Sequence, residues 1–117
     1  MAQLSTHVLD TARGAPAAGV LIEVRKVGDS SGAPLATATT NVQGRTDAPL
    51  VAADRLEPGV YELTFHIGDY FRRQGVASTE PPFLDRVVIR IGIAEAGGRY
   101  HIPLLVSPYG YTTYRGS

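Results

Sequence analysis

The stretch Gly98–Ser117, GRYHIPLLVSPYGYTTYRGS, decides the fold of this chain. Two short runs of apolar and β-branched residues flank the turn signal Ser107–Gly110, so the sequence predicts a strand, a tight turn and a final strand that continues to the last residue. The last residues of a domain are usually small or polar and poorly ordered. Here Tyr111, Tyr114 and Arg115 place two phenols and a guanidinium at the end, which predicts a packed or ligand-facing terminus.

Upstream of this hairpin, apolar and polar residues alternate in several short segments, which predicts further strands. The expected strands are Leu4–Asp10, Val20–Val27, Leu35–Thr40, Val60–Ile67 and Arg86–Ile93, with turns such as Arg13–Pro16 and Asn41–Asp47 between them. Leu50–Leu56 fits either a short strand or a helical turn. Asp69–Gln74 begins with an N-cap residue and is followed by Gly75, which predicts one short helix. Roughly seven or eight short strands with close turns predict an all-β, antiparallel sandwich.

Length and composition narrow the classes of protein. A chain of 117 residues has room for a single domain, which we expect to cover residues 1–117. Eleven basic residues balance eleven acidic ones, so no net charge attracts nucleic acid or an anionic membrane. The absence of cysteine excludes disulfides and thiolate catalysis. No long apolar run or export leader is present, so we expect a soluble, cytoplasmic protein.

The candidates for acid–base chemistry near neutral pH are the three histidines, because an unperturbed imidazole titrates near about pH 6.5. His66 alternates with the polar residues of its predicted strand, which indicates a solvated surface position. His7 and His101 lie on the less apolar faces of their strands, where a surface role and a functional role are both open. A three-histidine zinc site would require all three rings to converge. The spacing imposes no such convergence, and we expect no metal and no cofactor.

Two arginines are candidates for binding a ligand. Arg45 follows the glycine of a predicted turn, and Arg115 stands near the end of the sequence. The planar guanidinium fork suits oxyanions, imides and other flat acceptor groups, although a single arginine can equally pair with a surface carboxylate. No Ser-His-Asp order, phosphate-binding loop or paired-carboxylate motif is visible. The residues alone therefore indicate a β-sandwich with two candidate imidazoles and two candidate guanidiniums.

Four motifs together resemble those of the transthyretin-related 5-hydroxyisourate hydrolases. They are STHVLD at Ser5–Asp10, Gly44-Arg45, YHIPLL at Tyr100–Leu105 and the terminal YRGS at Tyr114–Ser117. They follow the family's order over the whole chain, and the ending is the most specific of them. The resemblance implies a transthyretin-like sandwich of two four-stranded sheets with one short helix. It also implies a homotetramer, a dimer of dimers, whose active sites lie where the dimers meet.

The resemblance further implies hydrolysis of 5-hydroxyisourate to 2-oxo-4-hydroxy-4-carboxy-5-ureidoimidazoline in urate degradation. The residues carried over are His7, Arg45, His101 and the segment Tyr114–Ser117. We expect His101 to act as the general base and His7 as its partner or as a proton donor, although the two roles could be exchanged. Arg45 would bind the substrate and stabilise charge on the attacked carbonyl. In the last segment, Tyr114, Arg115 and Gly116 would contact the substrate, and Ser117 would offer its hydroxyl and a terminal carboxylate that could orient an imidazole.

Two positions depart from the family pattern. Gln43 stands where the family often has aspartate, and Arg99 stands where it often has a histidine.

Two other classes of protein remain as alternatives. A hormone carrier such as vertebrate transthyretin shares the fold but lacks the matching histidines and the YRGS ending. An immunoglobulin-like interaction module would explain the strands but not the ending. The four motifs therefore favour the enzyme.

Overall fold

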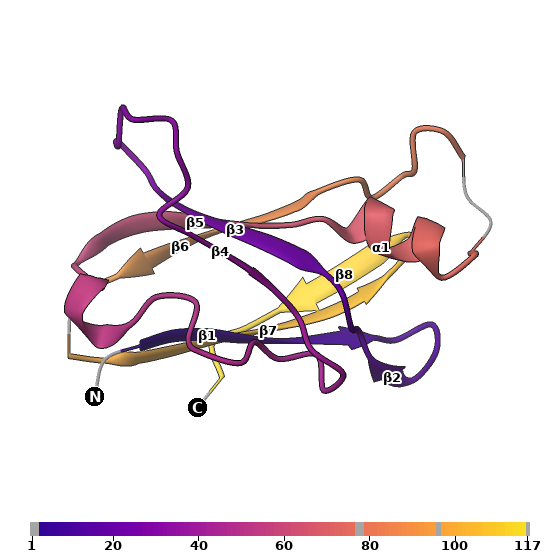
Figure 1. Cartoon of the computed structure of the whole chain (residues 1–117), viewed down its shortest axis with the longest axis horizontal. Coiled ribbons are helices and arrows are strands. Elements are labelled where there is room, and N and C mark those ends of the chain that lie inside the picture. Colours follow the sequence, from indigo (N-terminus) through magenta and orange to yellow (C-terminus); the bar gives the residue numbers. More distant parts are fainter. Residues whose placement is uncertain (1–2, 77–78, 96, 117) are drawn as a thin grey trace.

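Two four-stranded sheets pack face to face in a computed structural model of the protein, which describes residues 3–76, 79–95 and 97–116 (Figure 1). The first sheet has the strand order β2 (Ala15–Pro16), β1 (Gln3–Asp10), β7 (Arg99–Ser107), β8 (Gly110–Thr113). The second has the order β4 (Ala36–Thr39), β3 (Leu21–Lys26), β5 (Gly59–Phe65), β6 (Val87–Ile93). A 3-10 turn, η1 (Ala53–Arg55), and one α-helix, α1 (Ile67–Arg73), complete the regular structure of the described residues. The predicted sandwich with one short helix is confirmed.

Strict alternation of side chains decides what the first sheet presents to solvent. In β1 the residues Leu4 and Val8 are fully buried against the second sheet, whereas Ser5 and His7 are only half-buried on the outer face. The strand β7 alternates likewise except at Pro103, which is buried, and it directs His101 outward. The outer face of this sheet therefore holds both candidate imidazoles, while the alternate residues of the same strands build the core.

One strand pair runs against the predicted antiparallel pattern. The strands β1 and β7 are parallel, with Ser5 opposite His101 and His7 opposite Pro103. All the other strand pairs in the described residues are antiparallel. A period of two residues is the same in both strand directions, so alternation in the sequence could not reveal the orientation. This pairing joins the first and the penultimate strands at the centre of one sheet.

The helix begins earlier than predicted. It covers Ile67–Arg73, with His66 rather than Asp69 at the N-cap position, and Gly75 follows it with φ +74° as expected for a residue beyond a helix end. His66 is buried, and its Nε2 lies 2.8 Å from a carboxylate oxygen of Glu23. The prediction of a solvated His66 is therefore wrong, because the start of the helix turns this side chain toward β3.

Three other boundaries differ from the prediction. The segment Ala15–Pro16, expected in a turn, pairs with the end of β1. The ambiguous segment 50–56 combines both expected forms, since Val51 makes an isolated bridge to Leu4 before the 3-10 turn begins. The last strand ends at Thr113 instead of continuing to the last residue, and Gly116 returns to β7 through an isolated bridge to His101. No helix among the described residues is long and apolar enough to cross a membrane.

A buried carboxylate joins the end of β1 to α1. Asp10 is fully buried, and its Oδ1 accepts hydrogen bonds from the backbone N–H groups of Ala12 at 3.0 Å and Arg13 at 3.1 Å. Its Oδ2 accepts a hydrogen bond of 2.8 Å from the hydroxyl of Tyr70, a buried residue of α1. Because an unpaired buried charge is costly, these donors allow Asp10 to remain inside the sandwich.

We expect Tyr70→Phe to destabilise the fold by about 1.5–3 kcal/mol, because it removes a hydrogen bond to a buried charged group. Urea denaturation would measure the loss as a lower transition midpoint. The matched control is Tyr109→Phe, which removes the hydroxyl of a tyrosine that is 63% exposed and should leave the midpoint unchanged. Equal midpoints for the two variants would contradict the role of the Tyr70–Asp10 contact.

Candidate active site

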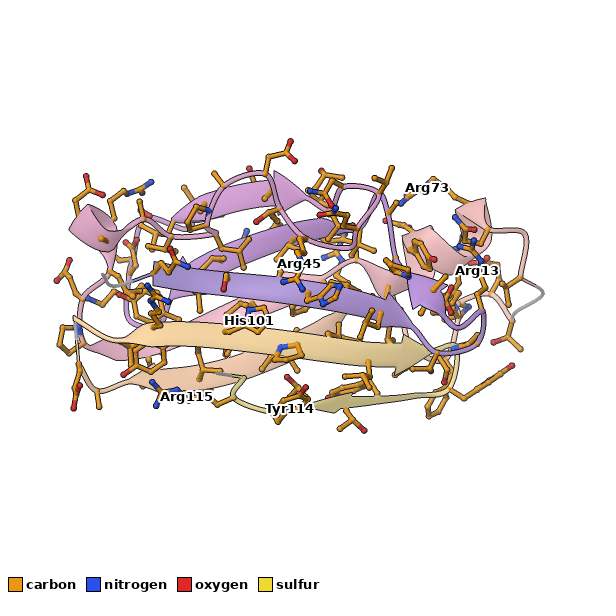
Figure 2. All side chains as sticks on the ribbon, turned by 90° about the horizontal axis from the view of Figure 1, so that it is seen from below. Arg13, Arg45, Arg73, His101, Tyr114 and Arg115 are labelled. Carbon is orange, nitrogen blue, oxygen red and sulfur yellow. The ribbon has the colours of Figure 1, made fainter. Side chains whose placement is uncertain are left out.

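The parallel register brings Ser5 and His101 into contact on the outer face of the first sheet. Ser5 Oγ lies 2.9 Å from His101 Nδ1. Figure 2 views this face and shows Arg45 beside β1, with His101 close to it on β7. Arg45 and His101 line one depression, and the turn that carries Arg45 contacts His7 through the carbonyl of Gln43. The structure thus brings together His7, Arg45 and His101, the three residues expected to perform the chemistry.

A tight turn positions Arg45. Asn41 Oδ1 accepts hydrogen bonds from the backbone N–H groups of Gln43 at 2.9 Å and Arg45 at 3.2 Å, which closes the turn. Gly44 has φ +75° and its carbonyl accepts a 2.8 Å hydrogen bond from the N–H of Val8 in β1. A Cβ at position 44 would stand only 2.3 Å from the Val8 carbonyl oxygen, so only glycine lets the turn dock on β1 at this distance.

The same turn determines the tautomer of His7. The Nε2 atom of His7 lies 2.9 Å from the carbonyl oxygen of Gln43. A carbonyl only accepts hydrogen bonds, so Nε2 carries the proton, and the neutral ring keeps its lone pair on Nδ1. The contact uses the main chain of Gln43 and not its side chain. The departure from the family pattern at position 43 therefore leaves this interaction with His7 intact.

The environment keeps both imidazoles neutral near pH 7. Partial burial lowers the pKa of His7 below its ordinary value, and the nearby Arg45 charge lowers it further, while the hydrogen bond to Gln43 acts in the opposite direction. Burial also lowers the pKa of His101, and the charges of Arg45 and of His7 add to this effect. A neutral imidazole is the form that accepts a proton from water.

A depression of about 360 Å³ lies between these strands and the segment after the turn. Its size lies near the lower end of the range for small-molecule sites. Most of the residues that line it are polar, and they come from β1, β7 and the segment 45–49. The lining residues are Gln3, Ser5, Thr6, Arg45, Thr46, Asp47, Ala48, Pro49 and His101.

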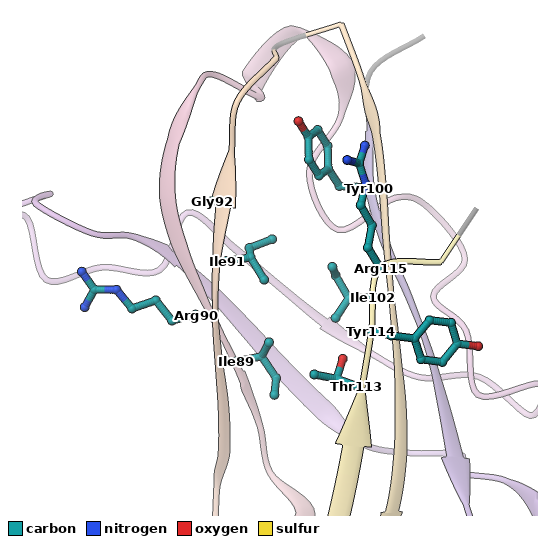
Figure 3. A pocket seen from close by; sticks show the side chains of 9 residues that line it. All are labelled: Ile89, Arg90, Ile91, Gly92, Tyr100, Ile102, Thr113, Tyr114 and Arg115. Atoms are coloured by element: carbon teal, nitrogen blue, oxygen red, sulfur yellow. The ribbon is translucent and has the colours of Figure 1, made fainter.

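Of the last described residues, Gly116 contacts His101, whereas the side chains of Tyr114 and Arg115 point elsewhere. The N–H of Gly116 donates a 2.7 Å hydrogen bond to the carbonyl of His101, and a Cβ at position 116 would stand 2.7 Å from Cδ2 of that ring. Tyr114 is 59% exposed, and Figure 3 shows its ring pointing away from the side chain of Arg115. The structure does not bring the Arg115 guanidinium to the imidazoles, because it stacks on Tyr100, whose side chain points to the opposite face of β7. Ser117 lies outside the described residues.

Sequence reasoning missed two parts of the site. Ser5 and His7 are two residues apart on one strand, so alternation predicts their common face, but the contact between Ser5 and His101 requires the parallel register. The Gln43 carbonyl is a main-chain group and leaves no signal in the residue type. The third histidine does not join the site: His66 lies at the N-cap of α1, hydrogen-bonded to Glu23.

Comparison with known proteins identifies the family. A family model described as HIUase/transthyretin matches residues 4–116 of the chain. The chain belongs to the HIUase/transthyretin family. The resemblance seen in the sequence motifs is thereby confirmed.

Within the HIUase/transthyretin family, the chain resembles proteins named as hydrolases at higher identity than a transthyretin. It is 52% identical to the 5-hydroxyisourate hydrolase of Deinococcus radiodurans, over 97% of this chain and 95% of that protein. The solved 5-hydroxyisourate hydrolase of Klebsiella pneumoniae is 40% identical with a TM-score of 0.82, and all of both chains is covered. The transthyretin of Sparus aurata is 28% identical with a TM-score of 0.85, over 97% of this chain and 96% of that one. The fold is therefore common to both branches.

We expect Arg45→Gln to raise the pKa of His7 and His101, because it removes a positive charge that disfavours the protonated rings. NMR titration of the imidazole C–H signals would measure both values. In the unmodified protein both should lie below 6.5. The control is Arg86→Gln, since Arg86 is an exposed residue on the second sheet's side of the sandwich. Unchanged values in Arg45→Gln would show that Arg45 does not act on these rings.

Proposed function

We propose that this protein hydrolyses 5-hydroxyisourate to 2-oxo-4-hydroxy-4-carboxy-5-ureidoimidazoline, a step of urate degradation. The observation that carries the proposal is the grouping of two imidazoles and one guanidinium on the outer face of the first sheet. Its chemistry fits the hydrolase name of the Deinococcus radiodurans relative, which is 52% identical over almost the whole chain.

The general base in this proposal is His101. Ser5 occupies Nδ1, so Nε2 is the ring nitrogen available to a ligand in the depression that His101 lines. When Nδ1–H donates to Ser5 Oγ, Nε2 carries the lone pair that takes a proton from the attacking water. Because burial and Arg45 lower the pKa of His101, the ring is in the required neutral form near pH 7.

His7, the second imidazole, supplies a hydrogen-bond acceptor. The Nε2–H of His7 is committed to the Gln43 carbonyl, so only its Nδ1 lone pair is available to the substrate or the water. His7 therefore holds the attacking water or a ring N–H of the substrate. After the water attacks, His101 returns its proton to the departing ring nitrogen as the carbonyl–nitrogen bond breaks and a carboxylic acid forms. No co-reactant other than water is required.

Arg45 binds the acceptor-rich substrate and stabilises the negative charge that grows on the attacked carbonyl oxygen. It lines the depression beside His101, and none of the ion pairs between described residues uses its guanidinium. A preorganised donor of this kind can contribute about 3 kcal/mol to the transition state. Tyr114 and Gly116 contact the substrate from the last segment, and Ser117 orients an imidazole through its carboxylate.

The proposal also includes the expected homotetramer, with active sites formed where two dimers meet. The candidate site lies on an outer sheet face, where Arg45 and Tyr114 are exposed in the single chain, and a facing subunit would exclude water from it. The single domain over residues 1–117, the cytoplasmic location and the absence of a cofactor, of nucleic acid and of a membrane partner stay predictions.

We expect the protein to accelerate the ultraviolet decay of freshly prepared 5-hydroxyisourate, and His101→Ala to lower kcat by about 10²–10⁴-fold, the range for loss of a general base. The matched control is His66→Gln, which alters the histidine at the start of α1 and keeps a donor for Glu23. It should keep kcat within about threefold of the unmodified protein. Decay no faster than the blank with the unmodified protein would exclude the enzyme and leave the carrier function.

The pH dependence follows from the direction of the pKa shifts. Because the pKa of His101 lies below its ordinary value of 6.5, the ring stays neutral as the pH falls through 6.5 and is protonated only at lower pH. We therefore expect kcat/KM to be retained at pH 6.5 and to fall below it, as measured over a buffer series from about pH 5 to 8. A half-maximal value at or above pH 6.5 would contradict a depressed base.

A further inference from the structure

The Arg115 guanidinium makes specific contacts on the face of β7 opposite the imidazoles. Its Cζ atom lies 4.2 Å from the centroid of the Tyr100 ring, and its Nη2 donates a 3.0 Å hydrogen bond to the carbonyl of Arg99. Figure 3 shows the side chain running along β7 toward Tyr100. A planar cation over a tyrosine face at this distance is a cation–π contact. Arg115 is thus fixed to the inner side of β7.

The Tyr100 ring is a rigid platform for this contact. Tyr100 is only 6% exposed. Its hydroxyl oxygen accepts hydrogen bonds from the backbone N–H groups of Ala94 at 3.2 Å and Glu95 at 3.1 Å, in the turn that leads out of β6. The ring is held at its face by packing and at its tip by hydrogen bonds. A group stacked on it is therefore held in place relative to β7.

Gly116, the residue after Arg115, contacts His101, the proposed general base. The N–H of Gly116 donates to the carbonyl of His101 at 2.7 Å. The backbone of Gly116 approaches the Cδ2 edge of the His101 ring so closely that a Cβ would stand 2.7 Å from that atom. On the opposite edge of the ring, Ser5 Oγ lies 2.9 Å from Nδ1. The ring is thus held between Ser5 and Gly116, and no hydrogen bond between described residues uses Nε2.

We propose that Arg115 is a positioning residue for His101: its stacking on Tyr100 holds Gly116 against the imidazole and so directs Nε2 toward the substrate. This inference rests on the proposed function. Arg115 then acts on the reaction through His101 and not through the substrate contact that the sequence motifs imply. Tyr100, to which those motifs assign no role, becomes part of the site as the ring on which Arg115 stacks. Because Arg115 and Gly116 are adjacent, any release of the guanidinium loosens the backbone that contacts the ring.

The test compares Arg115→Met with Arg90→Met. Arg90 is a matched control, because Arg90 and Arg115 both line a pocket between β6 and β8, whereas the ion pair of Arg90 is with Glu62 of β5 at 3.6 Å. We expect Arg115→Met to lower kcat by about 10–100-fold with KM within about threefold, since a misplaced base slows the chemical step without weakening substrate binding. Arg90→Met should change neither constant.

Two further variants separate the stacking from general damage. Tyr100→Leu removes the aromatic face and should lower kcat to the same extent as Arg115→Met, whereas Tyr100→Phe keeps the packed face, loses only the hydrogen bonds at the tip and should lower kcat less than Tyr100→Leu. The double variant Arg115→Met with Tyr100→Leu should be no slower than either single variant, because both remove one contact. Additive losses would show that the two residues act independently and would overturn the proposal.

NMR of the His101 ring gives a readout that does not depend on activity. Release of Gly116 exposes the ring, so the pKa of His101 should rise toward 6.5 in Arg115→Met and stay unchanged in Arg90→Met. If the protein has no hydrolase activity but this shift occurs, the proposed function fails while the positioning contact stands.

A raised KM with unchanged kcat would make Arg115 a substrate ligand. A lower thermal midpoint with unchanged kcat and unchanged pKa would make it a purely structural residue. Either result would overturn the inference.

Discussion

The parallel pairing of β1 with β7 is the constraint on which the candidate site depends. It sets Ser5 opposite His101 and places His7 one pair further along the same face. A shift of this register by one residue would turn one row of side chains into the core, where Leu4, Val8 and Leu104 are fully buried. The packing of the apolar residues therefore fixes the position of the imidazoles, although it makes no direct use of them.

The turn 41–47 adds the guanidinium to this face through main-chain geometry. Gly44 allows the turn to approach β1, and Asn41 closes it around the N–H groups of Gln43 and Arg45. The carbonyl of Gln43 then accepts a hydrogen bond from Nε2–H of His7. One turn thus delivers the cation, fixes one imidazole tautomer and, through the charge of Arg45, favours the neutral form of both rings.

Much of this arrangement was predictable from the sequence, and the exceptions have physical reasons. Alternation predicted the strands and the outward positions of His7 and His101, and Gly44 marked the turn that presents Arg45. Alternation could not give the parallel orientation of β1 and β7, because it is independent of strand direction. It also misplaced His66, since the helix begins at the next residue and turns that ring toward Glu23. The role of Arg115 was hidden because only the fold shows that Tyr100 lies beneath it.

The inward and outward residues of β1 and β7 are under different physical constraints. The inward set must fill the space between the sheets, whereas the outward set is free to change without disturbing that packing. A descendant of this chain could lose its imidazoles and keep its architecture, or acquire them on an existing scaffold. Such independence offers a physical account of how one sandwich can carry different outer faces in the two branches, HIUase and transthyretin, that the family description joins.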